Sequence, residues 1–417
     1  MTVQNNPIDT RQQRDHERYA LQLYRGQQLQ QVRSEVREQW LAAVNPGAAM
    51  QSCFEAAFDE VMFGAVIWAL NQDPLYPKVI TISRIPHRLG NLDIPGSRWG
   101  IDNPDSVYRV IPVSGDERYL ISGKVAEQRL VENYFTLWDP DMRTVGLLSG
   151  KDLVVDADGS FTISVDSEPA GDRVNHIQSC ATAKEFYIRD VLADWSGDRV
   201  NELSVKRLGE VPSRGPRLAE EDLALAAEYM RKWATNTVRW NNQALDKPAN
   251  DFIFTIDRDT DGALRNQIYI MGHFHLPDPG QVLVLDVNMG GAEYFIAPIT
   301  NYWGTTNNIV ERNGCLNMMQ SRANADGTYT FVLSTVDPGV HNWLDPDDMD
   351  TGILTLRWAE FEADQANDEL GVTSRLMPLD EFLATAPADQ RVSPAQRLAL
   401  SQQRSDSYQW RLTEEKR

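Results

Sequence analysis

Two short segments of the chain combine acidic, aromatic and amide side chains at a spacing that suits acid–base chemistry. The first is RWGIDNPDSVYR at residues 98–109, which leads into a strand pattern and contains Trp99, Asp102, Asn103, Asp105 and Tyr108. In an aromatic-walled pocket, Asp102 or Asp105 would act as general acid or base and Tyr108 as proton donor. The same residues also suit a structural turn, in which Asp102 and Asn103 bind backbone amides while Tyr108 packs. Both interpretations remain open.

The second segment is DPGVHNWLDP at residues 337–346, which follows the strand pattern TYTFVLSTV. Its Asp-Pro-Gly start predicts a turn, and we expect Trp343 to fill a core or a pocket and Asn342 to cap backbone groups. We also expect Asp345 to pair with Arg357 on the next strand, with His341 as a candidate acid. A purely structural Asp–Arg pair is the alternative, because removing one partner of a buried pair leaves an uncompensated charge whatever its role.

A third segment, YWGTTNNIVERNGCLN at residues 302–317, places amides and one arginine beside a tryptophan. These groups suit recognition of a hydroxyl or a carboxylate, and they equally suit a loop whose polar groups bind one another. The three segments together supply the predicted substrate-binding residues, which are Trp99, Asn103, Asn301, Trp303, Arg312, Asn317, Asn342 and Trp343.

One pair of histidines could bind a metal. His273 and His275 are two residues apart in a strand pattern, so both would lie on one face. The glutamate and third histidine that such a site needs do not follow at a suitable spacing. DRDTDG at 257–262 resembles the start of a calcium loop, but the required twelfth-position glutamate is Ile268, so a hairpin turn is predicted. Nucleotide-binding and serine-hydrolase motifs are absent, and we predict no metal and no cofactor.

The elements that must position these residues follow from the hydrophobic pattern. Helical periodicity covers residues 8–72 with a break at Asn45-Pro46-Gly47, and short alternating runs from about 78 to 210 predict strands. A helix is predicted at 219–245, strands return at 250–360, and a polar helical tail begins near 375. Because the strands come in blocks, antiparallel sheets are expected. No internal repeat is evident.

Composition limits the partners. The chain has 417 residues and a formal charge of -20, which on average repels nucleic acid and anionic membranes. Its longest apolar run, at 61–70, is too short to span a bilayer. The N-terminus lacks a secretory pattern, and three widely spaced cysteines suit a reducing compartment. We therefore predict a cytoplasmic protein with a small-molecule ligand and no nucleic-acid or membrane partner, and we leave homo-oligomerisation open.

Two blocks resemble bacterial proteins that carry the domain of unknown function numbered 1214, which is often found with the related domain of unknown function 1254. One is SRWGIDNPDSVYRVIPVSGDERYLISGKV at 97–125, and the other includes NYWGTTNN, DPGVHNWLDP and GILTLRW. The resemblance implies a β-barrel-like or sandwich region and a jelly-roll-like C-terminal domain. It also implies catabolic settings for lipophilic compounds but no defined chemistry. A histidine expected after NWLDP is missing here, where DDMDTG follows.

The predicted fold class is α+β, with N-terminal helices, an antiparallel β-rich domain, a connecting helix and a jelly-roll-like β-sandwich with a helical tail. The predicted divisions are an N-terminal helical segment at 1–75, a β-rich domain at 76–215, a connecting helix at 216–248, a jelly-roll-like domain at 249–375 and a helical tail at 376–417.

Three functions fit these residues. The first is a cofactor-independent acid–base enzyme, of lyase, isomerase or hydrolase type, that acts on a small lipophilic metabolite with hydroxyl or carbonyl groups. Asp102 or Asp345 would be its base and Tyr108 or His341 its acid, with Arg357 orienting Asp345. The second is a non-catalytic binding protein for a lipophilic small molecule. The third is a metal-dependent jelly-roll enzyme that uses His273 and His275.

Overall fold

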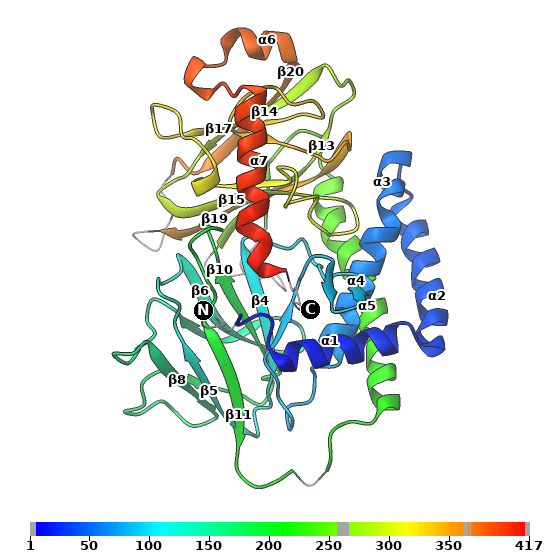
Figure 1. Ribbon diagram of the computed structural model, residues 1–417, viewed down its shortest axis with the longest axis vertical. Coiled ribbons are helices and arrows are strands. Elements are labelled where there is room, and N and C mark those ends of the chain that lie inside the picture. The colour runs from blue at the N-terminus through cyan, green and yellow to red at the C-terminus, as the bar shows by residue number, and fades with distance from the viewer. Residues whose placement is uncertain (1–5, 213, 257–266, 362–365, 367, 413–417) are drawn as a thin grey trace.

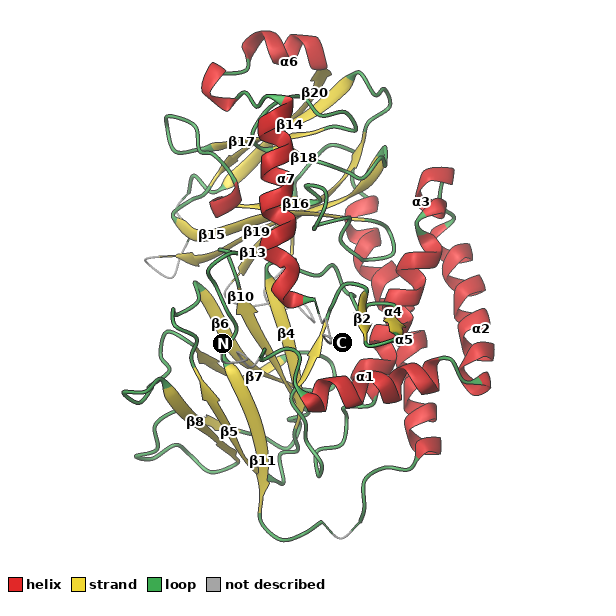
Figure 2. Ribbon diagram, in the orientation of Figure 1, coloured by secondary structure: helices red, strands yellow, loops and turns green. Residues whose placement is uncertain are grey.

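The computed structural model describes residues 6–212, 214–256, 267–361, 366 and 368–412. The hairpin turn predicted at 257–262 lies outside these residues. The fold is α+β, as expected: the N-terminal helices and a long central helix pack along one side of two largely antiparallel β-sandwiches (Figures 1 and 2). Within the described ranges, no helix combines the length and the hydropathy needed to cross a bilayer.

Four N-terminal helices pack with a long helix from the middle of the chain. The apolar run at 61–70 lies in α4 and is buried, as predicted, and Asn45 ends α2 in the left-handed conformation with a φ of 45°. Long helix α5 runs beside α4 (Figure 1). The bounds are α1 Arg11–Tyr24, α2 Gln27–Val44, α3 Ala48–Ser52, α4 Phe54–Ala69 and α5 Ala219–Leu245.

The first sandwich consists of a sheet in the order β1-β4-β10-β6-β7 and a second sheet in the order β11-β5-β8-β9. Side chains from the facing sides of the two sheets form its core, which includes Phe135, Phe186 and Ile188. A small β2–β3 hairpin lies outside the sandwich. The strands are β1 Ile80–Ile82, β2 His87–Leu89, β3 Leu92–Ile94, β4 Ser106–Pro112, β5 Arg118–Lys124, β6 Glu132–Trp138, β7 Thr144–Ser149, β8 Ser160–Asp166, β9 His176–Gln178, β10 Glu185–Val191 and β11 Glu202–Leu208.

The second sandwich has sheets in the orders β12-β13-β19-β15-β16 and β18-β17-β14-β20. Its core includes Phe331, Leu356 and Trp358. The last strand continues to Pro378, so the helical tail begins a few residues later than predicted. The strands are β12 Phe254–Ile256, β13 Gln267–His275, β14 Gln281–Asn288, β15 Ala292–Thr300, β16 Cys315–Asn317, β17 Tyr329–Leu333, β18 Trp343–Leu344, β19 Thr351–Phe361 and β20 Gly371–Pro378.

The tail connects both sandwiches. Helix α7 lies across the second sandwich and ends near the first (Figure 1). Beyond it, Arg411 donates a hydrogen bond from Nη1 to the carbonyl of Pro104 at 2.8 Å. The tail elements are helix α6 Leu379–Thr385, helix α7 Pro394–Tyr408 and the short 3-10 turns Ala388–Gln390 and Gln409–Arg411. Another 3-10 turn, Met318–Gln320, follows β16.

The two sandwiches share one topology. Strand β1 of the first sandwich corresponds to β12 of the second, and strands β4 to β11 correspond, one by one in chain order, to β13 to β20. With this correspondence, the strand order of each sheet in the first sandwich is the same as that of a sheet in the second. The match includes the one parallel pair in each described sandwich, β8–β9 and β17–β18. The expectation of no internal repeat is therefore wrong at the level of structure. The repeat is carried by strand order and not by evident residue identity.

We call β1-β4-β10-β6-β7 the first wall sheet and β12-β13-β19-β15-β16 the second wall sheet. Each packs one face into its own sandwich core. Their other faces lie toward each other in the middle of the molecule, beside α4 and α5 (Figures 1 and 2). Hydrogen bonds join the two sheets there, for example from the Tyr134 hydroxyl to Glu360 Oε1 at 2.7 Å.

Candidate functional site

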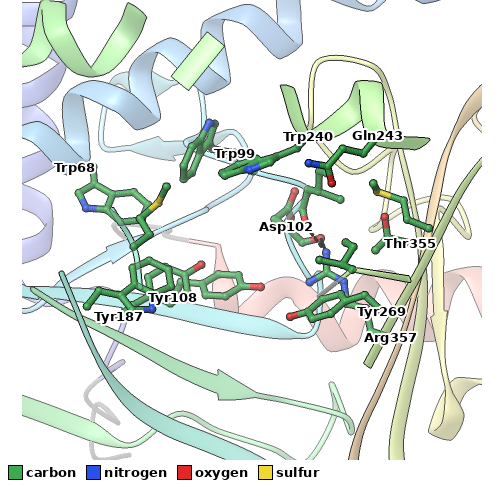
Figure 3. Close-up of a pocket in the computed structure, with 16 residues that line it drawn as sticks. Trp68, Trp99, Asp102, Tyr108, Tyr187, Trp240, Gln243, Tyr269, Thr355 and Arg357 are labelled. Carbon is green, nitrogen blue, oxygen red and sulfur yellow. Dashed lines mark hydrogen bonds between the residues drawn. The ribbon is translucent and has the colours of Figure 1, made fainter. Parts of the chain in front are cut away.

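A cavity of about 110 Å³ lies between the two wall sheets and the helices. Residues from both sandwiches, from α4 and α5 and from the segment at 99–102 form its lining (Figure 3). Strand alternation explains which side chains reach it, since neighbouring residues point to opposite faces. The lining residues are Trp68, Trp99, Gly100, Ile101, Asp102, Tyr108, Trp138, Met142, Tyr187, Trp240, Gln243, Ile256, Tyr269, Met271, Thr355 and Arg357.

Equivalent positions of the repeat meet in this cavity. In the first wall sheet, Tyr108 of β4 is paired with Arg189 of β10. In the second wall sheet, Tyr269 of β13 is paired with Arg357 of β19. The edge strands β1 and β12 each add an isoleucine beside these tyrosines: Ile82 of β1 is paired with Tyr108, and Ile256 of β12 is paired with Tyr269. Each sheet therefore has a row of an isoleucine, a tyrosine and an arginine on three neighbouring strands. Tyr108 of the first row and Ile256, Tyr269 and Arg357 of the second row line the cavity.

One end of the cavity is aromatic. Tyr187 stacks on Trp138 at 4.1 Å between ring centroids and on Tyr108 at 5.1 Å. Trp99 stacks on Trp233 of α5 at 4.0 Å and contacts the Trp68 ring edge-on at 5.5 Å. Figure 3 shows Trp68, Tyr187 and Tyr108 gathered at this end, with Trp99 and Trp240 along the opposite wall. Such rings offer flat apolar surfaces that suit a planar ligand.

The other end of the cavity is polar and holds a buried cation. Arg357 is only 5% exposed and lies beside Tyr269 and Thr355 (Figure 3). Its Nη2 donates hydrogen bonds to the carbonyl oxygens of Ile101 and of Asp102, the latter at 3.3 Å. Among the described residues no carboxylate lies within 4.0 Å of its guanidinium, and its buried Nε has no hydrogen-bond partner. A buried cation is costly unless it is paired.

Three other arginines near the wall sheets have carboxylate partners. Arg189 is paired with Glu132 and Arg109 with Asp190. Arg98, beside the segment at 99–102, binds the Glu60 carboxylate through two nitrogens at 2.7 Å each. Arg357 therefore differs from these three arginines in what compensates its charge. Arg404 and Arg411 of the tail also have no carboxylate partner among the described residues, and their hydrogen bonds go to carbonyl, amide and thiol groups.

The backbone that contacts Arg357 is strained. Ile101 has a φ of 58°, a conformation that a β-branched residue rarely adopts. Its N–H donates to the Gly304 carbonyl at 3.0 Å, and its own carbonyl accepts from Arg357. Strain of this kind costs on the order of 1–3 kcal/mol and is found most often at functional sites.

Hydrogen-bond donors predominate among the polar groups of the lining. The indole N–H groups of Trp138 and Trp240 and the Thr355 hydroxyl are buried without a partner among the described residues. Burial raises the pKa of Tyr269 to about 12 and raises that of Tyr187 well above its usual value, so both phenols keep their protons at neutral pH. This set of groups suits a ligand that accepts hydrogen bonds.

Two predicted acid–base residues, Asp102 and Tyr108, do lie at the cavity. The Tyr108 hydroxyl accepts a hydrogen bond from the Asn103 N–H at 3.0 Å, which leaves its own proton free to be donated. The Asp102 carboxylate accepts from the N–H and the hydroxyl of Thr306, each at 3.3 Å. Burial raises the pKa of Asp102, while Arg98 and Arg357 oppose that shift.

The predicted pair between Asp345 and Arg357 is wrong. Asp345 instead forms a two-pronged pair with Arg312, with both N–O distances at 2.7 Å. Arg312 also binds Asp347 and Asp348, at 2.9 and 3.0 Å. The turn at 337–346 places Asp345 beside the loop that carries Arg312, whereas alternation along β19 turns Arg357 toward the cavity. Arg357 therefore cannot orient Asp345.

The remaining residues of the DPGVHNWLDP segment lie outside the cavity. Trp343 donates from its indole N–H to the Ser334 carbonyl at 2.9 Å and packs beneath Arg397 of α7. Asn342 caps backbone groups, as expected, by donating to the carbonyls of Arg322 and Thr330. His341 lines a separate hollow against α7. The segments at 98–109 and 337–346 thus do not form one site.

Most of the predicted substrate-binding amides have structural partners. The Asn103 side chain binds the Tyr294 hydroxyl at 3.0 Å, and Asn317 donates to Asp105 at 2.8 Å. Asn301 holds its own turn through Thr305. Trp303 is fully buried against Phe54 of α4, with ring centroids 4.4 Å apart. Of the predicted binding residues, only Trp99 lines the cavity.

Asp105, the alternative acid or base, is fully buried between the sandwiches. Its carboxylate accepts hydrogen bonds from the Trp195 indole at 2.7 Å, the Tyr294 hydroxyl at 2.9 Å and the Asn317 amide at 2.8 Å. Burial raises its pKa to about 6. Asp105 does not line the cavity, and its contacts join the two sandwiches.

The two histidines of β13 do not form a cluster of metal ligands. His273 binds the Ala244 carbonyl through Nδ1 at 3.0 Å, and His275 is exposed. No group of three or more potential ligands occurs among the residues that the structure describes.

Several lining residues were not identified from the sequence, notably Trp68, Trp138, Tyr187, Trp240 and Tyr269. A signal was present in two strands, since EFYIRDV and QIYIMGH carry large side chains at alternate positions on both faces. A strand that is apolar or aromatic on both faces is covered on both. The sequence could not indicate what covers the second face.

Comparisons with known proteins bear on the fold. No protein-family model and no curated protein matches the chain. The crystal structure of an uncharacterized protein from Burkholderia cenocepacia is similar, with 21% identity and a TM-score of 0.71 over 87% of this chain and 99% of that one. The VPA0106 protein from Vibrio parahaemolyticus has 12% identity and a TM-score of 0.41, over 78% of this chain and 99% of that one. The Burkholderia structure shows that the fold occurs in another protein, and the function has to be argued from the cavity.

Proposed function

We propose that this protein binds a small, largely aromatic molecule that carries a hydrogen-bond-accepting oxygen, such as a carbonyl, a hydroxyl or a carboxylate. The observation that carries this proposal is the buried Arg357, which has no carboxylate partner among the described residues and borders the cavity. Unlike Arg404 and Arg411, which also lack a carboxylate partner among the described residues, Arg357 borders this aromatic cavity, where a ligand can contact its guanidinium. An accepting oxygen of a ligand would supply the missing partner.

The rest of the lining supports the same ligand class. Aromatic rings wall one end, where the Trp138 indole also offers an unpartnered donor. The protonated Tyr269 phenol and the unpartnered Thr355 hydroxyl lie near the other end. The cavity volume of about 110 Å³ is close to the ~150 Å³ of an apolar protein cavity that binds benzene. The volume therefore limits the enclosed part of the ligand to a single ring, which agrees with the chemistry of the lining.

This proposal is tested by ligand-observed NMR and thermal unfolding with a panel of single-ring probes: acetophenone, benzamide, phenol and benzoate. At least one should bind to the wild type with a rise in melting temperature, and Arg357→Gln should weaken its binding about tenfold or more. Arg231→Gln is the matched control, because Arg231 is half exposed and pairs with Glu35 far from the cavity. If no probe binds, or if both variants bind every probe like the wild type, the proposal fails.

A second candidate is cofactor-independent acid–base catalysis on a bound carbonyl compound. The raised pKa of Asp102 favours it, together with the donors that would stabilise negative charge developing on the carbonyl oxygen. Asp102 would remove a proton from the carbon next to the carbonyl, and Tyr108 would donate one to the oxygen. The resemblance of the segment at 97–125 to proteins from catabolic settings is consistent with such chemistry.

This candidate has a direct assay. In D₂O, the wild type should accelerate deuterium incorporation into the methyl group of acetophenone, and Asp102→Asn should abolish that acceleration while still binding the ketone. Equal exchange in the wild type, in Asp102→Asn and in buffer would remove the catalytic candidate and leave binding as the function.

A further inference from the structure

The internal repeat permits a comparison between two arginines at equivalent positions. Arg189 of β10 is paired in register with Tyr108 of β4, and Arg357 of β19 with Tyr269 of β13. Both arginines lie on the faces of the wall sheets that meet across the cavity. Both are buried, at 1% and 5% exposure. The two halves of the molecule thus place one buried guanidinium each at the same point of the same sheet.

The compensating carboxylate has no counterpart in the second half. Glu132 of β6 forms the ion pair with Arg189 of β10. In the strand register, Glu132 lies opposite Val191, which follows Arg189 by two residues on β10. The equivalent position in the second half is found in the same way. Ala359 follows Arg357 by two residues on β19, and it lies opposite Tyr294 of β15. A tyrosine therefore stands at the position that holds the neutralising glutamate in the first half. The Tyr294 hydroxyl is itself bound to Asp105 and Asn103.

Other carboxylates do not replace that glutamate. The carboxylate of Asp102 interacts electrostatically with Arg357, but its oxygens accept hydrogen bonds from Thr306. The guanidinium of Arg357 contacts only the backbone carbonyl of Asp102. Asp345, the partner expected from the sequence, is held by Arg312. One cation of the symmetric pair is thus neutralised by a carboxylate within the protein. The other, Arg357, binds two backbone carbonyls and has no carboxylate partner among the described residues.

Resting on the proposed function, we infer that the ligand is an anion, and specifically a single-ring aromatic monocarboxylate. Its carboxylate would bind Arg357 at the polar end, as Glu132 binds Arg189, and its ring would lie between the tryptophan and tyrosine walls. A planar guanidinium matches a carboxylate with two hydrogen bonds. The unpartnered Nε of Arg357 supplies one donor of that fork.

The size and shape of the cavity exclude larger members of this class. The cavity of about 110 Å³ is smaller than the ~150 Å³ cavity that binds benzene, so a ligand with two or more rings does not fit inside it. The distribution of groups sets the orientation, because the aromatic residues Trp68 and Tyr187 lie at the end opposite Arg357 and Thr355 (Figure 3). A neutral ligand of the same shape would leave the buried charge uncompensated.

The experiment compares four probes by isothermal titration calorimetry and ligand-observed NMR: benzoate, its neutral analogue benzamide, the non-planar cyclohexanecarboxylate and inorganic phosphate. Benzoate should bind the wild type at least tenfold more tightly than benzamide and more tightly than the other two anions. Arg357→Gln should lose at least tenfold in benzoate affinity while its affinity for benzamide changes less than threefold. Arg357→Lys keeps the charge and should retain part of the preference for benzoate.

The outcomes separate this inference from the proposed function. If benzamide binds as tightly as benzoate, the ligand is not recognised by its charge and the inference is overturned, while binding of an aromatic acceptor stands. If phosphate or cyclohexanecarboxylate equals benzoate, the aromatic class is wrong. If no aromatic probe binds the wild type, the proposed function fails as well. Circular dichroism of each variant checks that its fold is retained, and Arg231→Gln should bind all four probes like the wild type.

Discussion

Replacing each of the two equivalent arginines by methionine should have very different effects on stability. In Arg189→Met, the Glu132 carboxylate stays buried, with Gln267 Nε2 as a donor at 2.9 and 3.2 Å. Removing one partner of a buried pair typically costs ~3–5 kcal/mol. We expect the free energy of unfolding of the ligand-free protein to fall by about that amount.

In Arg357→Met, two opposing effects nearly cancel. The variant loses the hydrogen bonds to the carbonyls of Ile101 and Asp102, each worth ~1.5–3 kcal/mol with a charged donor. It also removes a buried charge whose effective burial penalty is several kcal/mol, and the flexible methionine fills the same space. The expected change is therefore within about 1 kcal/mol of zero.

Urea denaturation without ligand, followed by tryptophan fluorescence and by far-UV circular dichroism, measures both changes. Coincidence of the two probes checks that one transition is being compared. We expect Arg189→Met to be less stable than Arg357→Met by ~2–6 kcal/mol. Equal losses in the two variants, or a loss above ~3 kcal/mol for Arg357→Met, would mean that the Arg357 charge is already compensated within the protein. The argument for a ligand anion would then collapse.

Three further results are expected. Burial raises the pKa of Asp105 to about 6, so the folded state keeps a proton that the unfolded state releases near pH 4. The free energy of unfolding should therefore fall by up to ~3 kcal/mol between pH 4 and 6 because of this group. If urea denaturation of Asp105→Asn still shows the full decline over this pH range, Asp105 is not its cause. Arg312→Ala should lower the free energy of unfolding by ~1–3 kcal/mol, because Asp345 is left without its partner. Its benzoate affinity, measured by calorimetry, should equal that of the wild type. A loss of affinity would show that the DPGVHNWLDP segment contributes to the binding site. Trp240→Leu should weaken benzoate binding by roughly five- to tenfold, because a ring contact and an indole donor are lost. Unchanged affinity would mean that the benzoate ring does not contact Trp240.

The sequence predicts the local structure of this chain well, because the relevant signals are local. The apolar run at 61–70 predicts buried α4, and the polar–aromatic segment at 98–109 does bring Trp99, Asp102 and Tyr108 to a cavity. Helical periodicity, turn residues and alternating strands depend on neighbours within a few positions. The fold class follows from the order in which these elements occur.

The parts that the sequence does not predict depend on which distant strands become neighbours. Arg357 is turned toward the cavity by alternation along β19, but its nearest groups, the carbonyls of Ile101 and Asp102, lie more than 250 residues earlier in the chain. Tyr187 and Tyr269 become cavity residues only because the outer faces of two sheets meet. The repeat is visible mainly in strand order. A few equivalent positions keep the same residue, such as Tyr108 and Tyr269 or Arg189 and Arg357, but others do not, since Glu132 corresponds to Tyr294 and Tyr187 to Thr355.

The most direct test of the central claim is a crystal structure of the wild-type protein with benzoate bound. The account predicts the ring between the tryptophan and tyrosine walls, with both carboxylate oxygens within hydrogen-bond distance of the Arg357 guanidinium. Benzoate bound in the cavity with its carboxylate turned away from Arg357, or bound only outside the cavity, would contradict it.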